Sequence, residues 1–180
     1  MTCIVGMLNE NKIYVGADNA GCTESIHVSR DDDKVFIKDE MIIGCTTSFR
    51  MINLLRYQFN RPLHDPRKTV DEYIYTDWIE DVRKLFKEKG FSTINNNVET
   101  GGNFILGYKG NLYEIDNDFQ VAKPKNPFCC VGSGMFFAYG AMRILIKDVS
   151  LKPDEILTQA LEVAEEYNPF VRGPFKILNI

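Results

Sequence analysis

The sequence predicts an α+β fold in which two packed sheets are covered on their outer faces by pairs of helices. Segments rich in β-branched and aromatic residues come in pairs around polar turns, and two stretches between them have helical periodicity. Along the chain the order is strands, two helices, strands, two helices and a closing strand. Two sheet halves and two helix pairs are the elements that this architecture requires.

The strands are predicted mainly from three hairpins. Each hairpin joins two segments rich in Ile, Val, Phe or Tyr across a short turn of Asn, Asp, Glu, Lys or Gly. The paired segments are residues 2–8 with 12–18, 34–37 with 41–45, and 104–108 with 112–115. Two further strands are expected at 128–131 and 175–180.

The helices are predicted from apolar residues at a period near 3.6. Thr46-Thr47-Ser48 can cap a first helix that ends near Asn60, and Thr69 opens a long second helix that ends at Gly90. Two more helices are expected at 135–147 and 154–167. Trp78, within the second helix, is expected to pack in the core rather than to bind a ligand.

Composition limits the class of protein. A chain of 180 residues that is 44% hydrophobic predicts one domain, residues 1–180, with a substantial core. A net charge of −4 gives no general reason to expect a nucleic-acid partner. No apolar run resembles a signal peptide or a membrane span, so we expect a cytoplasmic protein without a membrane partner. Five cysteines without a Cys-x-x-Cys motif, and only two histidines, predict neither a metal site nor a disulfide framework, and no cofactor is expected.

The chain begins with a potential nucleophile. A threonine hydroxyl needs a nearby base for acyl transfer, and a free α-amine has a pKa of about 7.7–8.0, so it is partly neutral near pH 7. Removal of Met1 would give Thr2 both groups. Taken by its position alone, Thr2 is better interpreted as an ordinary first residue of a strand.

Four segments in a fixed order favour the interpretation of Thr2 as a nucleophile. Thr2-Cys3-Ile4-Val5-Gly6, Gly16-Ala17-Asp18, Lys34-Val35 and Gly132-Ser133-Gly134 together resemble proteasome β-type subunits, and more closely the bacterial two-ring threonine protease driven by an unfoldase ATPase. The resemblance extends from Thr2 to about Leu178. It implies a four-layer α/β/β/α sandwich of two antiparallel sheets, the N-terminal nucleophile hydrolase fold.

The resemblance also implies roles for particular residues. Thr2 matches the nucleophile and Lys34 the lysine beside it, where an ammonium favours the alkoxide-like state. Asp18 matches the carboxylate that pairs with this lysine. Gly44 matches the donor of an oxyanion N–H, and Ser133 the serine that hydrogen-bonds near the amine of the nucleophile.

Other matched positions are less regular. Asn168 stands where many proteasome subunits have an aspartate, and Val171 replaces a later hydroxyl residue, although an asparagine can still hold a network by hydrogen bonds. Cys22, Ile42 and Thr46 match positions that line the substrate groove or first specificity pocket.

The resemblance implies a threonine-type endopeptidase whose subunits form a homo-oligomeric ring around a chamber, with polypeptide as substrate and an unfoldase ATPase as a further partner. Three alternatives remain open at this point. The chain could be an amidase or acylase for a small substrate, or a non-catalytic assembly protein, which Asn168 and Val171 favour. Cys3 could be the nucleophile, but exposing it requires removal of two residues and shifts the register against Lys34.

Overall fold

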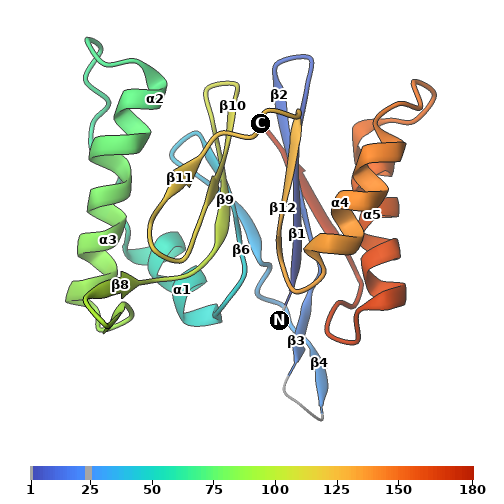
Figure 1. The fold of residues 1–180 in the computed structure, drawn as a ribbon, viewed down its shortest axis with the longest axis horizontal. Coiled ribbons are helices and arrows are strands. Elements are labelled where there is room, and N and C mark those ends of the chain that lie inside the picture. The colour runs from blue at the N-terminus through green and yellow to red at the C-terminus, as the bar shows by residue number, and fades with distance from the viewer. Residues whose placement is uncertain (1, 23–25) are drawn as a thin grey trace.

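Four layers make up the fold: helices, a sheet, a second sheet and further helices (Figure 1). The structure is a computed structural model that describes residues 2–22 and 26–180. The predicted α/β/β/α sandwich is therefore confirmed, and the two sheets face each other in its centre.

The first sheet has four strands in the order β12, β1, β2, β13, with antiparallel neighbours throughout. Their bounds are Phe128–Gly132 for β12, Cys3–Asn9 for β1, Lys12–Ala17 for β2 and Lys176–Asn179 for β13. The turn between β1 and β2 places Glu10 and Asn11 at φ 48° and 67°, the pair of left-handed residues that a two-residue hairpin loop requires. The first predicted hairpin is thus confirmed, together with the closing strand.

The second sheet has five antiparallel strands in the order β11, β10, β9, β6, β5. Their bounds are Val121–Ala122 for β11, Asn111–Ile115 for β10, Phe104–Tyr108 for β9, Met41–Cys45 for β6 and Val35–Lys38 for β5. The predicted hairpins β5–β6 and β9–β10 are both present, and β6 joins them by pairing with β9.

The helices lie where the periodicity predicts them. Ser48 caps α1 (Phe49–Asn53), which continues as the π-helical turn η1 (Leu54–Gln58). Thr69 caps α2 (Val70–Tyr73), which continues without a break through the π-helical turn η2 (Ile74–Trp78) into α3 (Ile79–Glu88). The second pair is α4 (Met135–Leu145) and α5 (Pro153–Tyr167), packed against each other.

Two short hairpins lie outside the sequence prediction. One consists of β3 (Ala20–Cys22) and β4 (His27–Ser29), the other of β7 (Thr93–Asn95) and β8 (Val98–Thr100). All four strands have only three residues, which is too short to show an alternation of apolar and polar residues in the sequence. The β7–β8 hairpin lies in the segment 91–102, for which no strand was expected.

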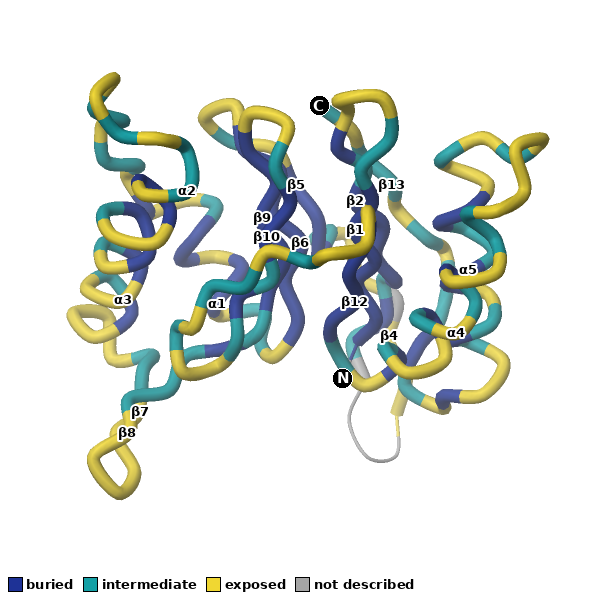
Figure 2. Tube along the Cα trace, turned by 45° about the horizontal axis from the view of Figure 1, so that its top comes forward, coloured by how far each residue is buried: buried dark blue, intermediate teal, exposed yellow. Residues whose placement is uncertain are grey.

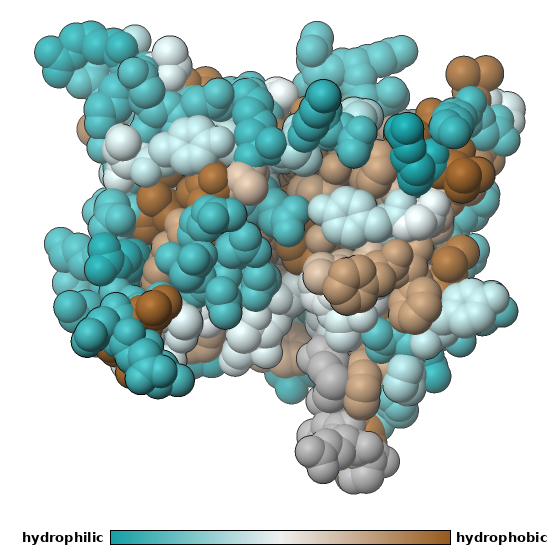
Figure 3. All heavy atoms as spheres, viewed as in Figure 1, coloured by the Kyte–Doolittle hydropathy of each residue, from teal (hydrophilic) through white to brown (hydrophobic). Residues whose placement is uncertain are grey.

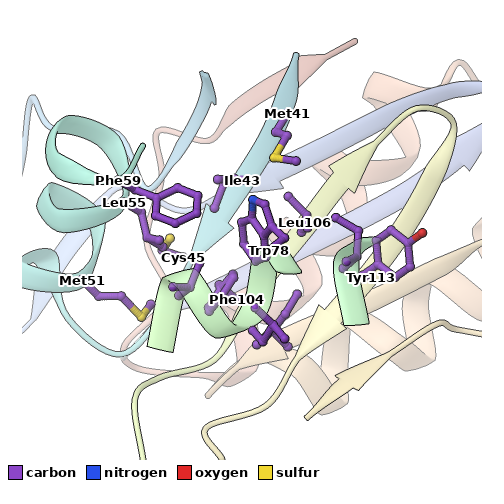
Figure 4. Packing of buried hydrophobic residues seen from close by; sticks show 14 of the residues in the cluster. Met41, Ile43, Cys45, Met51, Leu55, Phe59, Trp78, Phe104, Leu106 and Tyr113 are labelled. Carbon is purple, nitrogen blue, oxygen red and sulfur yellow. The ribbon is translucent and has the colours of Figure 1, made fainter. Parts of the chain in front are cut away.

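Three apolar clusters fill the spaces between the four layers. One lies between the five-stranded sheet and helices α1 to α3, a second between the four-stranded sheet and helices α4 and α5, and the third between the sheets. The central strands β6 and β9 are buried throughout, whereas the helices expose their outer sides (Figure 2). Trp78 is fully buried in the first cluster, near Phe59 and Phe104, so its predicted packing role is confirmed (Figure 4).

The two sheets approach each other closely at glycines. A Cβ atom on Gly107 of β9 would lie 2.5 Å from Ile42 Cγ2 and 2.6 Å from Ile13 Cγ2. Ile13 belongs to β2 in the facing sheet and Ile42 to β6, the neighbouring strand of the same sheet. Because both side chains are buried, a methyl group at Gly107 would force one or both of them to move.

We therefore predict that Gly107→Ala lowers the free energy of unfolding by about 1–3 kcal/mol, the usual cost of overpacking a core. The control is Gly140→Ala in α4, where an added Cβ has nothing within 4 Å. That control is expected to raise stability by about 1 kcal/mol through helix propensity. Urea unfolding of both variants measures the difference, and equal stability of the two would contradict a tight contact between the sheets.

Candidate active site

Four of the predicted site residues, Thr2, Asp18, Lys34 and Ser133, meet because they lie at one end of the two sheets. Thr2 precedes β1 and Asp18 follows β2, its antiparallel neighbour, so the two residues are brought together by the pairing of Ile4 with Ala17. Ser133 follows β12, the other neighbour of β1. Lys34 precedes β5 in the facing sheet. The start of the chain marks this end in Figure 1, at the lower centre of the view.

Burial separates these residues from the other polar residues that the structure describes. Within residues 2–22 and 26–180, the buried polar or charged residues are Thr2, Asp18, Lys34, Thr46 and Asn168. Each of the five was predicted from the sequence as a site residue. Polar groups are rarely buried without partners, because their desolvation must be offset by hydrogen bonds or charge pairing.

Asp18 and Lys34 form a buried ion pair. Lys34 Nζ lies 2.8 Å from Asp18 Oδ2, and both side chains are almost completely shielded from solvent. Two backbone N–H groups also donate to this carboxylate, from Cys3 at 2.9 Å and from Ala20 at 3.2 Å. Asp18 therefore ties the lysine of one sheet to the backbone beside Thr2 in the other.

Thr2 is fixed by the turn that enters α4. Its backbone N–H donates to Ser133 Oγ at 3.2 Å, and its carbonyl oxygen accepts from Gly134 N–H at 3.3 Å and from Ser133 Oγ at 3.4 Å. Gly132, at φ 99°, allows this close approach, because a Cβ there would lie 2.3 Å from the Thr2 carbonyl oxygen. Ser133 thus contacts the atom that becomes the α-amine once Met1 is removed.

Asn168 stabilises the turn that contains Ser133. It ends helix α5, and its Nδ2 donates to the Ser133 carbonyl at 2.7 Å while its Oδ1 accepts from Phe170 N–H at 2.9 Å. Val171, which replaces a hydroxyl residue, is buried among apolar side chains beside Gly134. The asparagine therefore positions Ser133 through its backbone.

A cavity of about 100 Å³ opens beside Thr2. Thr2, Lys34 and Thr46 line it, together with residues that were not predicted for the site. Those additional residues are Ala20, Thr47, Ser48, Phe49 and Ile52. Ala20 lies two residues after Asp18, and the other four follow Thr46 within six residues, up to and inside the first turns of α1. This closeness in sequence to predicted site residues is the signal that could have identified them.

The remaining predicted residues differ in whether they line the cavity. Thr46 lines the cavity, whereas Ile42 is fully buried between the sheets, against Gly107, and does not reach it. Gly44 lies inside β6, paired with Val35 on one side and Ile105 on the other. It is not among the cavity-lining residues, and its role as an oxyanion donor stays a prediction. Cys22 belongs to β3, and its side chain lies outside the described part of the structure.

The Cys3 side chain points away from the cavity side of β1. It is fully buried against helices α4 and α5, and burial, reinforced by the Asp18 carboxylate, raises the pKa of its thiol well above the ordinary value. A thiol that stays protonated is a poor nucleophile. These surroundings favour Thr2 over Cys3 as the nucleophile.

The described residues contain no group of three or more His, Cys, Asp or Glu side chains that could hold a metal ion. None of the helices within residues 2–22 and 26–180 is long and apolar enough to cross a membrane.

Comparison with known proteins agrees with the resemblance in the sequence. No family model matches the chain. The ATP-dependent protease subunit HslV of Caldicellulosiruptor saccharolyticus is 26% identical over 76 residues, which are 42% of this chain and 43% of that protein. The chain is thus aligned with less than half the length of this relative.

Solved structures match over almost the whole chain. Thiobacillus denitrificans BPH, alone, has a TM-score of 0.85 at 16% identity and covers 99% of this chain and 97% of its own. Its complex with epoxomicin has a TM-score of 0.84 at 16% identity, covering 99% and 98%. HslV from Trypanosoma brucei has a TM-score of 0.71 at 19% identity, covering 99% and 98%. The chain therefore has the same four-layer fold as these solved structures. The partial match to an HslV sequence agrees with the family resemblance in its own sequence.

Proposed function

We propose that this protein is a threonine-type endopeptidase that uses Thr2 as an N-terminal nucleophile after removal of Met1. The observation that carries the proposal is the coincidence of burial and chemistry at one end of the sheets. A hydroxyl, a carboxylate and an ammonium are buried together there, beside a cavity that opens next to Thr2. The name of the HslV relative, a protease subunit, supports the same activity.

The reaction would proceed in two acyl-transfer steps. Thr2 Oγ attacks the carbonyl carbon of the scissile peptide bond, and its proton passes to the free α-amine of the same residue. That proton then goes to the nitrogen of the leaving amine as the C–N bond breaks, which leaves an ester on Thr2. Water, activated by the same amine, hydrolyses the ester and restores the hydroxyl.

The neighbouring residues would tune these steps. The Lys34 ammonium favours negative charge on Thr2 Oγ, and like-charge repulsion lowers the proton affinity of the amine. Asp18 keeps the ammonium in place by the 2.8 Å ion pair. Ser133, held by Asn168, contacts the Thr2 nitrogen at 3.2 Å and is placed to orient it.

Assembly into a homo-oligomeric ring in the cytoplasm, served by an unfoldase ATPase, completes the proposal. The relative is named as a subunit of an ATP-dependent protease, which supports both the association with further subunits and the ATPase partner. Helix α4 also exposes large apolar side chains, with Phe136 at 75% and Ile144 at 65% exposure. Hydrophobic side chains gather over α4 on the face drawn in Figure 3. Such a surface is suited to burial against a second copy of the chain.

The first prediction from this proposed function concerns the nucleophile. Intact-mass measurement of protein from native cells is expected to show loss of Met1, and treatment with an electrophilic peptide inhibitor, or with epoxomicin, is expected to add one inhibitor mass at Thr2. Thr2→Ala should prevent the adduct and any peptide hydrolysis without changing the fold, since Cys3 N–H and the Thr2 carbonyl keep their partners. A retained Met1 would contradict the proposed peptidase activity, because Thr2 would then lack a free α-amine.

The second prediction separates catalysis from stability. Lys34→Met leaves the Asp18 carboxylate buried without its ammonium, which is expected to cost about 3–5 kcal/mol of unfolding free energy. The double variant Asp18→Asn/Lys34→Met removes both charges and should recover most of this loss. Neither variant should form the inhibitor adduct. Urea unfolding and mass spectrometry measure the two effects, and a double variant that is still labelled would remove the ion pair from the mechanism.

The third prediction concerns assembly. Light scattering coupled to size-exclusion chromatography is expected to give the mass of a closed ring for the wild-type protein. Phe136→Glu/Ile144→Glu places charges on the α4 surface and should shift the protein toward smaller species. Lys152→Glu, at the exposed start of α5, is the matched charge control. A monomeric wild type that cleaves acylated amino acids but not unfolded polypeptide would favour a small-substrate amidase instead.

A further inference from the structure

Thr47 has an unusual backbone conformation for its residue type. Its φ is 53°, in the left-handed region that β-branched residues rarely occupy. Most other non-glycine residues at positive φ in the described chain form the tips of two-residue hairpin loops, such as Asn96 and Asn97. Thr47 instead connects β6 to α1, where no hairpin loop requires this conformation.

A set of hydrogen bonds from Asn103 fixes this conformation. The Asn103 N–H donates to Thr47 Oγ1 at 3.1 Å, while the Asn103 carbonyl accepts from Thr46 N–H at 3.1 Å and from Thr46 Oγ1 at 2.8 Å. The two threonine hydroxyls are 3.1 Å apart. Since Thr46 Oγ1 gives its proton to Asn103, Thr47 Oγ1 donates between them, and every hydroxyl proton has an acceptor.

Packing reinforces these bonds. Gly102 lies directly over Thr47, because a Cβ on Gly102 would be 3.0 Å from both Cβ and Oγ1 of Thr47 and 2.7 Å from Met51 Sδ. The Asn103 side chain in turn donates to Asp116 Oδ1 at 3.2 Å, which anchors the segment to the end of β10. A strained residue persists where its surroundings determine its conformation in this way.

The strained residue Thr47 lines the cavity beside Thr2. Thr46 and Thr47 line the same cavity as Thr2 and Lys34, on the wall that comes from the five-stranded sheet. Because the Thr47 hydroxyl is occupied by Asn103 and Thr46, it has no proton to offer to a reaction at Thr2. Its role is therefore to shape the wall and not to take part in the chemistry.

We propose that Thr47 and Asn103 form a clamp that holds one part of the wall of the Thr2 cavity in a strained conformation and thereby positions the polypeptide segment that is cleaved. This inference rests on the proposed peptidase function and adds two positioning residues to it. Strain that is retained for function gives an unusual signature, since relieving it lowers activity without lowering stability.

Thr47→Gly tests this signature, because glycine adopts positive φ without a steric penalty and removes the hydroxyl that accepts from Asn103. Its Tm is expected to equal or exceed that of the wild type, while kcat/KM for a fluorogenic peptide falls by about tenfold or more, mainly through a higher KM. Thr47→Ser retains the hydroxyl and should recover at least about half of the activity. Asn97→Gly, at the tip of the β7–β8 hairpin, relieves a left-handed residue away from the cavity and is the matched control, with unchanged kcat and KM.

Amide hydrogen exchange gives a readout that does not depend on activity. The Asn103 N–H should exchange slowly in the wild type and faster in Thr47→Val, which keeps the side-chain shape and lacks the acceptor. Wild-type kinetics in Thr47→Gly, or a fall in Tm together with activity, would overturn the clamp. A wild-type protein that forms no Thr2 adduct would overturn the peptidase function, whereas exchange at Asn103 would still report whether the clamp exists.

Discussion

The buried ion pair between Asp18 and Lys34 is the interaction on which the rest of the site depends. It crosses from the end of β2 in one sheet to the start of β5 in the other, at 2.8 Å. Burying two charges brings little net stability, because their desolvation offsets much of their attraction. A hydrophobic pair would close the same end of the sandwich at least as well, so the charges are best explained by the chemistry beside them. The same carboxylate binds Cys3 N–H, which fixes the backbone next to Thr2.

The sandwich brings together residues that are far apart in the sequence, because one antiparallel strand ends where its neighbour begins, at the same end of the sheet. The start of β1, the end of β2 and the end of β12 lie together by strand pairing alone. The second pair of helices also positions the site, since Ser133 lies just before α4, which begins at Met135. Asn168 caps the end of α5, and its side-chain amide donates to the Ser133 carbonyl. The site thus uses both sheets and the outer helix layer, and each layer contributes a different kind of group.

Local sequence rules predicted most of the elements. The three main hairpins have turn residues that adopt positive φ, and the helices begin at Ser48 and Thr69 as their capping chemistry predicts. The hairpins β3–β4 and β7–β8 could not be predicted, because three-residue strands are too short to carry a periodic signal. Resemblance identified all five buried polar residues, but it could not show which way a strand residue faces. Ile42 illustrates this limit: it matches a groove position, yet its side chain lies between the sheets.

The placement of Thr2 bears on how removal of Met1 would affect the proposed site. Several contacts that fix Thr2 fall on its carbonyl oxygen and on the following N–H, through Gly134, Ser133 and Asp18. These atoms lie on the C-terminal side of the Thr2 Cα, so they do not depend on what is attached to its nitrogen. That nitrogen already lies 3.2 Å from Ser133 Oγ as an amide. Removing Met1 would therefore convert a fixed amide donor into an amine at the same place, and the base would appear without any rearrangement of the strands around it.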